Sequence, residues 1–171
     1  QPDHAAAWGN RGISLAQLGR YEEAIADFSH VVRLASDNAV AYFNRGVAYS
    51  RMNEHDLALG NYTMAIQLQP ERRESYRNRG FAQLRLGGYR EALADFDQAL
   101  RGNPKDAHIY YGRGSASEKL GNPDAALADY QAAIRLDSGR AAKASELQAE
   151  LGQVAFTFSA EGACGTSFDA Y

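Results

Sequence analysis

The sequence predicts an all-α protein, a solenoid (an α-α superhelix) built from repeated pairs of helices. Its 171 residues contain a 34-residue unit that is written four times in succession. One aromatic column recurs in the first half of each unit and a second in the second half: Trp8, Tyr42, Tyr76 and Tyr110, then Phe28, Tyr62, Phe96 and Tyr130. A fixed period of roughly 20–50 residues is typical of a solenoid or array. Function in such chains usually resides on an extended surface.

The first half of each unit has the pattern of an amphipathic helix that contains a small residue. In the first unit, Trp8, Leu15 and Leu18 share helical spacing, and Gly12 lies between them. The triplet around this glycine recurs with one change: Asn10-Arg11-Gly12, Asn44-Arg45-Gly46, Asn78-Arg79-Gly80 and Gly112-Arg113-Gly114. We therefore expect a helix in the first half of every unit.

A turn and a second amphipathic helix follow. The turn dipeptides are Gly19-Arg20, Asn53-Glu54, Gly87-Gly88 and Gly121-Asn122. Glycine and asparagine suit this place because a helix often ends in a left-handed residue. In the second half, Ala24, Phe28, Val31 and Leu34 recur at helical spacing. Acidic residues open this half and complement a helix dipole: Glu22, Glu23, Asp56, Glu91 and Asp124.

Residues equidistant from the turn are expected to face each other on the two antiparallel helices. About Gly19, this symmetry pairs Arg11 with Asp27 and Gly12 with Ala26. The later units repeat the first pair as Arg45 with Asn61, Arg79 with Asp95 and Arg113 with Asp129. We interpret it as a charge-assisted hydrogen bond that ties each hairpin, with a binding column as the alternative. The second pair predicts that small residues face each other.

These columns, in this order, closely resemble the tetratricopeptide repeat family. The resemblance covers residues 5–140 and divides them into repeats at 5–38, 39–72, 73–106 and 107–140. It implies a right-handed superhelix whose concave face is lined by the first helix of each repeat. Local departures are Ser36 and Ser138 in place of the terminal proline and Gly102 in place of leucine.

The ends of the chain fall outside the repeats. Residues 1–4 match the end of a repeat, so we interpret them as the stub of a preceding repeat or a linker, with a natural leader as the alternative. Residues 141–152 predict a capping helix, because the end of a solenoid needs a polar face. Residues 153–171 predict a tail outside the repeats, extended or disordered.

Composition argues against several classes of function. The net charge of −3 is too small to indicate nucleic acid as a partner, and no apolar run reaches the roughly 20 residues of a membrane helix. A single cysteine, Cys164, cannot form an intrachain disulfide, so an oxidising compartment is neither required nor excluded. The compartment stays open, with a soluble, cytoplasmic protein slightly favoured. His4, His30, His55 and His108 lie in different units without metal-ligand spacing. We expect no enzyme activity, cofactor or metal.

The expected binding site is the groove formed by the concave face of the superhelix. Aromatic, aliphatic and basic side chains there would contact a peptide, and an asparagine ladder could hold its backbone, although asparagines equally bond neighbouring helices. The predicted residues are Asn10, Phe43, Asn44, Val47, Arg51, Arg77, Asn78, Phe81, Arg85, Tyr111 and Lys119. The resemblance also brings in co-chaperones that clamp an acidic chaperone C-terminus with Lys, Asn and Arg. Of the equivalent residues here, only Asn44 matches, so that clamp is not expected.

The sequence therefore predicts a protein–protein interaction module, an adaptor or scaffold that binds an extended peptide, possibly acidic. One alternative is a self-assembling scaffold. In it the tail 153–171, which is acidic and aromatic, docks in its own or a neighbour's groove and gives homo-oligomers. Another alternative is the regulatory region of a larger protein.

Overall fold

The structure, a computed structural model, describes residues 2–102 and 104–136, and these form eight α-helices and no strand. The helices are α1 (Pro2–Gln17), α2 (Tyr21–Leu34), α3 (Ala39–Arg51), α4 (His55–Leu68), α5 (Arg73–Leu86), α6 (Tyr89–Gly102), α7 (Ala107–Lys119) and α8 (Pro123–Leu136). The all-α prediction is confirmed. The capping helix expected at 141–152 and the tail at 153–171 lie outside the described residues.

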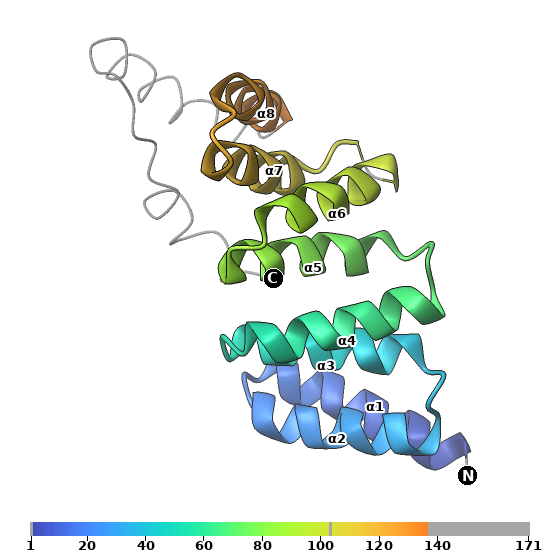
Figure 1. Cartoon of the computed structure of the whole chain (residues 1–171). Helices are drawn as coiled ribbons and strands as arrows, with labels where there is room; N and C mark the ends of the chain where they lie inside the picture. Colours follow the sequence, from blue (N-terminus) through green and yellow to red (C-terminus); the bar gives the residue numbers. More distant parts are fainter. Residues whose placement is uncertain (1, 103, 137–171) are drawn as a thin grey trace. The chain divides into compact units, whose positions relative to one another are not determined.

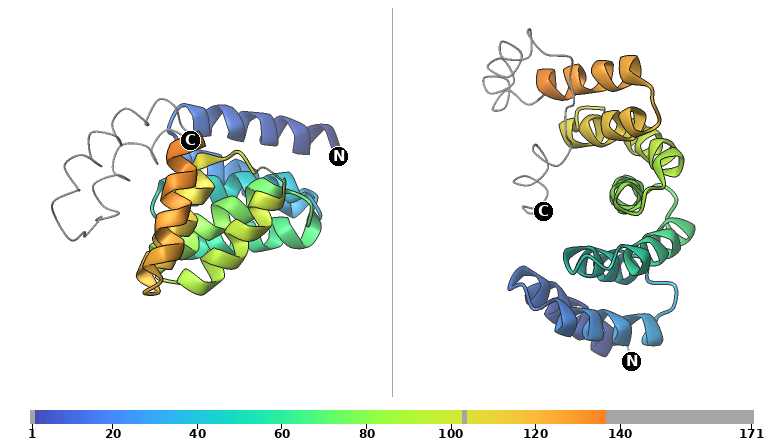
Figure 2. Two further views of the ribbon diagram at one scale, coloured as in Figure 1. Left: turned by 90° about the horizontal axis from the view of Figure 1, so that it is seen from above. Right: turned by 60° about the vertical axis from the view of Figure 1, so that its left-hand side comes forward.

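Consecutive helices pair as antiparallel hairpins: α1 with α2, α3 with α4, α5 with α6, and α7 with α8 (Figure 1). The chain divides into two compact units, Gln1–Pro104 and Lys105–Tyr171. In the first unit, α2 packs on α3 and α4 packs on α5. Figure 2 shows these six helices, coloured blue to green, following one another in sequence order. Helix α1 also contacts α3, and α3 contacts α5, so the first helices of three repeats are neighbours.

The turns within the hairpins have the predicted left-handed residue. Gly19, Asn53, Gly87 and Gly121 have φ values of 76°, 61°, 80° and 77°. The amide of Arg20 then donates to the carbonyl of Leu15 at 2.9 Å, and the other three turns repeat this bond. The bond satisfies a carbonyl that the end of the helix would otherwise leave without a partner.

The core of each of the first three hairpins is built on the aromatic residue of the second helix. Phe28, Tyr62 and Phe96 are almost completely buried, next to alanines such as Ala24 and Ala58. Burying one such ring contributes about 1.5–3 kcal/mol to folding. Small neighbours let the paired helices approach closely enough to enclose it.

The glycine of the first helix faces this aromatic ring, so the prediction that it faces a small residue is wrong. A Cβ atom on Gly12 would lie 2.8 Å from the ring of Phe28, whereas Ala26 is exposed. Gly46, Gly80 and Gly114 meet the corresponding ring of their own repeats in the same way. Helical side chains lean toward the helix N-terminus, and the simple mirror pairing ignored that lean.

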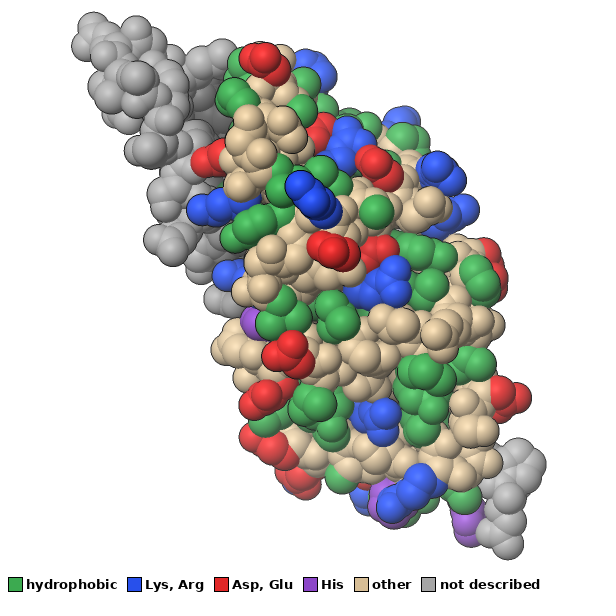
Figure 3. Space-filling view, viewed as in Figure 1, with side chains coloured by type: hydrophobic (Ala, Val, Ile, Leu, Met, Phe, Trp, Pro, Cys, Tyr) green, Lys and Arg blue, Asp and Glu red, His purple; other side chains and the backbone are tan. Residues whose placement is uncertain are grey.

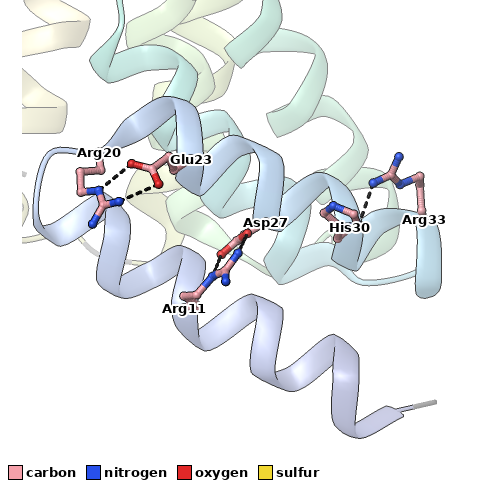
Figure 4. Close-up of polar contacts among 6 residues, drawn as sticks. All are labelled: Arg11, Arg20, Glu23, Asp27, His30 and Arg33. Carbon is pink, nitrogen blue, oxygen red and sulfur yellow. Dashed lines mark hydrogen bonds and ion pairs between the residues drawn. The ribbon is translucent and has the colours of Figure 1, made fainter.

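The predicted arginine pairing is confirmed in all four hairpins. In the first, Nε and Nη2 of Arg11 each donate to a carboxylate oxygen of the buried Asp27 at 2.7 Å (Figure 4). Arg79 with Asp95 and Arg113 with Asp129 repeat this fork, at distances between 2.6 and 2.9 Å. Each of the four arginines also lies over the aromatic ring three residues before it. This column therefore ties the hairpins together.

The same arginines connect one repeat to the next. Nη1 of Arg45 donates to the hydroxyl of Ser29 at 3.1 Å, and Nη1 of Arg79 donates to that of Thr63 at 3.2 Å. Ser29 and Thr63 lie on the second helix of the preceding repeat. A guanidinium has five N–H donors in a fixed fork, which allows one side chain to serve both contacts.

Candidate functional site

The first helices bring most of the predicted binding residues onto neighbouring elements. Nine of the eleven lie on α1, α3 and α5 of the first unit: Asn10, Phe43, Asn44, Val47, Arg51, Arg77, Asn78, Phe81 and Arg85. Tyr111 and Lys119 lie on α7 in the second unit. Both acidic and basic side chains appear on the face seen in Figure 3, and several acidic ones gather at its lower left. We call the side of α1, α3 and α5 that carries the nine residues the first-helix face.

Phe43 is part of the packing of the second repeat. The centroid of the Phe43 ring lies 5.9 Å from that of Tyr62. The guanidinium of Arg72 lies 4.3 Å from the centroid of the Phe43 ring. Val47 packs against the same cluster, which contains Ala58 and Tyr62. Phe43 is therefore held between an aromatic ring and a cation, and it remains half-buried.

Phe81 has the corresponding contact in the third repeat, from a position one helical turn later. Its ring meets that of Phe96 edge to face, with 4.9 Å between centroids. The guanidinium of Arg77 lies 6.0 Å from the ring of Phe81. An aromatic pair of this kind is worth about 0.5–1.5 kcal/mol beyond its buried area.

Asn78 is engaged inside the solenoid. Burial raises the pKa of the Tyr62 hydroxyl above its usual value, and hydrogen bonds from Ser50 and Asn78 oppose this effect without reversing it. Asn78 thus joins α5 to the preceding repeat. This is the kind of structural role that asparagine plays when it does not hold a ligand, although here the partner is a side chain and not backbone.

Asn10 and Asn44 have a different setting, at a pocket of about 590 Å³ between α1, α2 and α3. The pocket has no charged lining residue, and its walls are mostly aliphatic or small. It is lined by Ala5, Ala6, Gly9, Asn10, Ile13, Phe28, Val31, Leu34, Ala35, Asn38, Val40, Ala41 and Asn44. Sequence reasoning placed the two asparagines on the groove but missed the pocket. The available signal was Gly9, which stands in the column of Phe43 and Tyr111.

Charged groups flank the apolar residues toward the third repeat. Arg85 is exposed, whereas Arg51 and Arg77 are half-buried. His55 at the start of α4 is partly buried; this burial, and secondly the charge of Arg85, lower the pKa of its imidazole. The first-helix face therefore combines an uncharged end at α1 with basic side chains on α3 and α5.

In the second unit, Tyr111 packs on Tyr130 with 5.6 Å between ring centroids. The hydroxyl of Tyr130 donates to Oε2 of Glu118 at 2.7 Å. Burial first, and then the bond to this carboxylate, raise the pKa of Tyr130. An aromatic pair within one repeat is thus present in this unit as well.

Residues 2–102 and 104–136 contain neither a membrane-spanning helix nor a metal-binding cluster. None of the eight helices is long and apolar enough to cross a bilayer. No group of three His, Cys, Asp or Glu side chains in these ranges is arranged to hold a metal ion.

Solved structures show the same architecture at low sequence identity. A crystal structure of MamA is 22% identical with a TM-score of 0.76, and the match covers 82% of each chain. The first TPR of Spaghetti (RPAP3), bound to the HSP90 peptide SRMEEVD, is 24% identical with a TM-score of 0.69. That match covers 71% of this chain and 96% of the other. The Arabidopsis OM64 TPR domain is 22% identical with a TM-score of 0.66, over 68% of this chain and 96% of that one.

Sequence comparison gives the same family from both halves of the chain. Comparison with curated proteins found no match. Two family profiles, each described as tetratricopeptide repeat, match residues 3–71 and 77–141. Together they span most of the chain and overlap all four hairpins of the structure. The chain belongs to the tetratricopeptide repeat family.

Proposed function

We propose that this chain is a protein-interaction module that binds an extended peptide or protein segment on the first-helix face. Proteins of this family are generally non-catalytic interaction modules. The observation that carries the proposal is the side-by-side arrangement of α1, α3 and α5, which places an uncharged pocket beside basic and aromatic side chains. Mixed aromatic and arginine surfaces are typical of peptide recognition.

A similar structure supports the class of ligand without naming the partner. The first TPR of Spaghetti is bound to the acidic peptide SRMEEVD. The clamp of Lys, Asn and Arg that some members of the family use for such a terminus is not matched here, because Gly9, Ile13 and Glu74 take three of its places. Arg51, Arg77 and Arg85 can attract acidic groups in another arrangement, because guanidinium groups form two-pronged bonds to carboxylates.

Selection from a random peptide display library tests the proposal. The bait is the full chain, and the comparison is Arg77→Ala combined with Phe81→Ala. We expect enriched peptides that bind the wild type and lose at least about tenfold in affinity on the double variant, because an apolar and a charged contact disappear together. Circular dichroism checks that helicity is unchanged.

A matched control removes the same kinds of side chain from second helices. Arg90 and Met64 are exposed on α6 and α4, so Arg90→Ala with Met64→Ala should retain binding. Peptides that bind the Arg77/Phe81 variant as well as the wild type would remove the first-helix face from the proposal. The same conclusion would follow if no peptide were enriched on either form.

A second candidate function is self-assembly through the tail 153–171. This segment contains Glu161 and Asp169, no lysine or arginine, and four aromatic residues. Its composition complements a surface that carries Arg51, Arg77 and Arg85. Sedimentation of the full chain should then show a mass that rises with concentration, and deletion of 153–171 should abolish the rise. A monomer at every concentration would contradict this candidate.

A further inference from the structure

Three of the four repeats pair the recurring aromatic ring of the second helix with a ring from the first helix, whereas the first repeat stacks Trp8 on His30 at a different place. The second helix supplies one ring and the first helix of the same repeat supplies the other. The pairs are Phe43 with Tyr62, Phe81 with Phe96, and Tyr111 with Tyr130, with centroid distances of 5.9, 4.9 and 5.6 Å. The first helix provides its ring from one of two positions, which are a single turn apart.

The first repeat has the second-helix ring without its partner. Phe28 is the equivalent of Tyr62, but the two first-helix positions are occupied by Gly9 and Ile13. The uncharged pocket lies at this place, and Gly9, Ile13 and Phe28 all line it. Ile13 does not close the pocket, since its side chain remains 40% exposed.

The second repeat shows how a ring fits in such a place. Phe43 lies between Tyr62 and Arg72. One repeat earlier, the residues equivalent to Phe43, Tyr62 and Arg72 are Gly9, Phe28 and Asn38, and all three line the pocket. The pocket therefore corresponds to the space that Phe43 occupies in its own repeat.

We propose that this pocket receives an aromatic side chain of the C-terminal segment 153–171, from the same or a second copy of the chain. The inference rests on the proposed function of the first-helix face and specifies one subsite of it. The segment offers Phe156, Phe158, Phe168 and Tyr171, and none of the pocket residues is charged, which suits an uncharged ring. Burying a ring against Phe28 replaces the pairing that the other repeats build internally.

The surroundings of the pocket suit the rest of the segment. Asn10 and Asn44 line it and can each donate to and accept from an extended backbone. Toward α5 the first-helix face becomes basic, with Arg77 and Arg85. Glu161 follows Phe158 by three residues, and Asp169 follows Phe168 directly. An aromatic anchor with a carboxylate close behind it matches an uncharged pocket that lies beside basic side chains.

The full chain has a natural pair of probes for this docking. Trp8 is the only tryptophan and stands next to Gly9, while Cys164 is the only cysteine and lies in the segment. A fluorescent acceptor attached to Cys164 reports the approach of the segment through energy transfer from Trp8. The baseline is the same labelled chain with Phe156, Phe158, Phe168 and Tyr171 all replaced by serine. We expect clearly higher transfer in the wild type than in this four-fold variant.

Gly9→Phe fills the pocket from within, as Phe43 does in the next repeat. The substitution is compatible with the helix, because a Cβ atom on Gly9 meets only Val31, at an ordinary 3.8 Å. We expect energy transfer to fall to the four-fold baseline, with an unfolding temperature equal to or above that of the wild type. Gly9→Ala is the matched control, since it adds a methyl group, leaves room for a ring and should retain the transfer.

Two results would overturn the inference: transfer in the wild type no higher than in the four-fold variant, or transfer that survives Gly9→Phe. Dilution with unlabelled chain lowers the transfer only if the segment comes from a second copy, and the pocket is assigned in either case. The library selection, repeated on the four-fold variant, is independent of this experiment. If the selection yields peptides that need the first-helix face but energy transfer shows no docking of the segment, the inference is wrong and the proposed function is unaffected.

Discussion

At the scale of single residues, the arginine column shows one contact used four times with one informative exception. Arg11, Arg79 and Arg113 each hold a buried aspartate, whereas Arg45 holds the neutral Asn61, whose amide nitrogen also donates to the carbonyl of Leu57. A buried carboxylate without its partner costs far more than a buried amide that retains one bond. The second repeat should therefore tolerate loss of its arginine best.

Arg79→Ala is predicted to lower the free energy of unfolding by about 3 kcal/mol, because Asp95 would remain buried and charged without its partner. Arg45→Ala should cost about 1 kcal/mol, since the bonds lost at Asn61 and Ser29 are to neutral groups. Urea unfolding of both variants checks the difference. Equal losses would mean that the charge of Asp95 is compensated in another way.

His55 is predicted to make stability depend on pH. Burial lowers the pKa of its imidazole in the folded chain, so the unfolded chain binds protons more readily as the pH falls. Stability is therefore complete above about pH 6.5, the ordinary histidine value, and decreases below it. His55→Tyr introduces the residue that Tyr21 and Tyr89 provide in the same column.

Thermal unfolding at pH 7.5 and 5.5 checks this expectation. The loss of unfolding temperature at the lower pH should be smaller in His55→Tyr than in the wild type. His4→Gln is the control, because His4 is exposed and its substitution should leave the loss unchanged. An identical pH dependence in all three proteins would exclude His55 as the titrating group.

At the scale of helices, glycines on the two sides of one hairpin have opposite roles. A Cβ atom on Gly46 in α3 would lie 2.8 Å from the ring of Tyr62, whereas one on Gly60 in α4 would meet nothing within 4 Å. Glycine lowers the stability of a helix relative to alanine, and in α3 this loss makes room for the ring of Tyr62. No neighbouring atom requires a glycine at Gly60 in α4.

Gly46→Ala should therefore destabilise the chain by about 1–2 kcal/mol, because the clash with Tyr62 exceeds the gain in helix propensity. Gly60→Ala should stabilise it by about 0.5–1 kcal/mol. Each substitution adds one methyl group to a helix of the same hairpin, so urea unfolding compares them directly. Stabilisation by Gly46→Ala would show that the ring moves aside without cost.

The elements that sequence could predict are those fixed by short-range chemistry. The turns at Gly19 and Asn53 follow from the left-handed end of a helix, and the pairing of Arg11 with Asp27 follows from symmetry about the turn. Symmetry about the turn does not give the direction of a side chain, so it pairs Gly12 with Ala26, whereas Gly12 faces Phe28. The pocket escaped it for a related reason: it arises from what Gly9 lacks relative to the other repeats.

At the scale of the whole molecule, the repeats share a backbone plan and differ in what they present on their first helices. The first repeat of the family pattern presents an uncharged pocket, the second a ring held between Tyr62 and Arg72, and the third a ring beside Arg77. A periodic sequence predicts the shared plan because every unit repeats the same core. The repeats differ in the side chains that their first helices expose, and these differences would determine recognition. Their effect depends on three-dimensional packing, which the periodic pattern does not predict.

The most direct test of the central claim is to map where a bound peptide touches the chain. A library-selected peptide that carries a photoreactive benzophenone side chain would be irradiated with the full chain, and the cross-linked residues identified by mass spectrometry. The account predicts cross-links on α1, α3 and α5, lost in Arg77→Ala with Phe81→Ala and retained in Arg90→Ala with Met64→Ala. Cross-links concentrated on α2, α4 and α6 would contradict it.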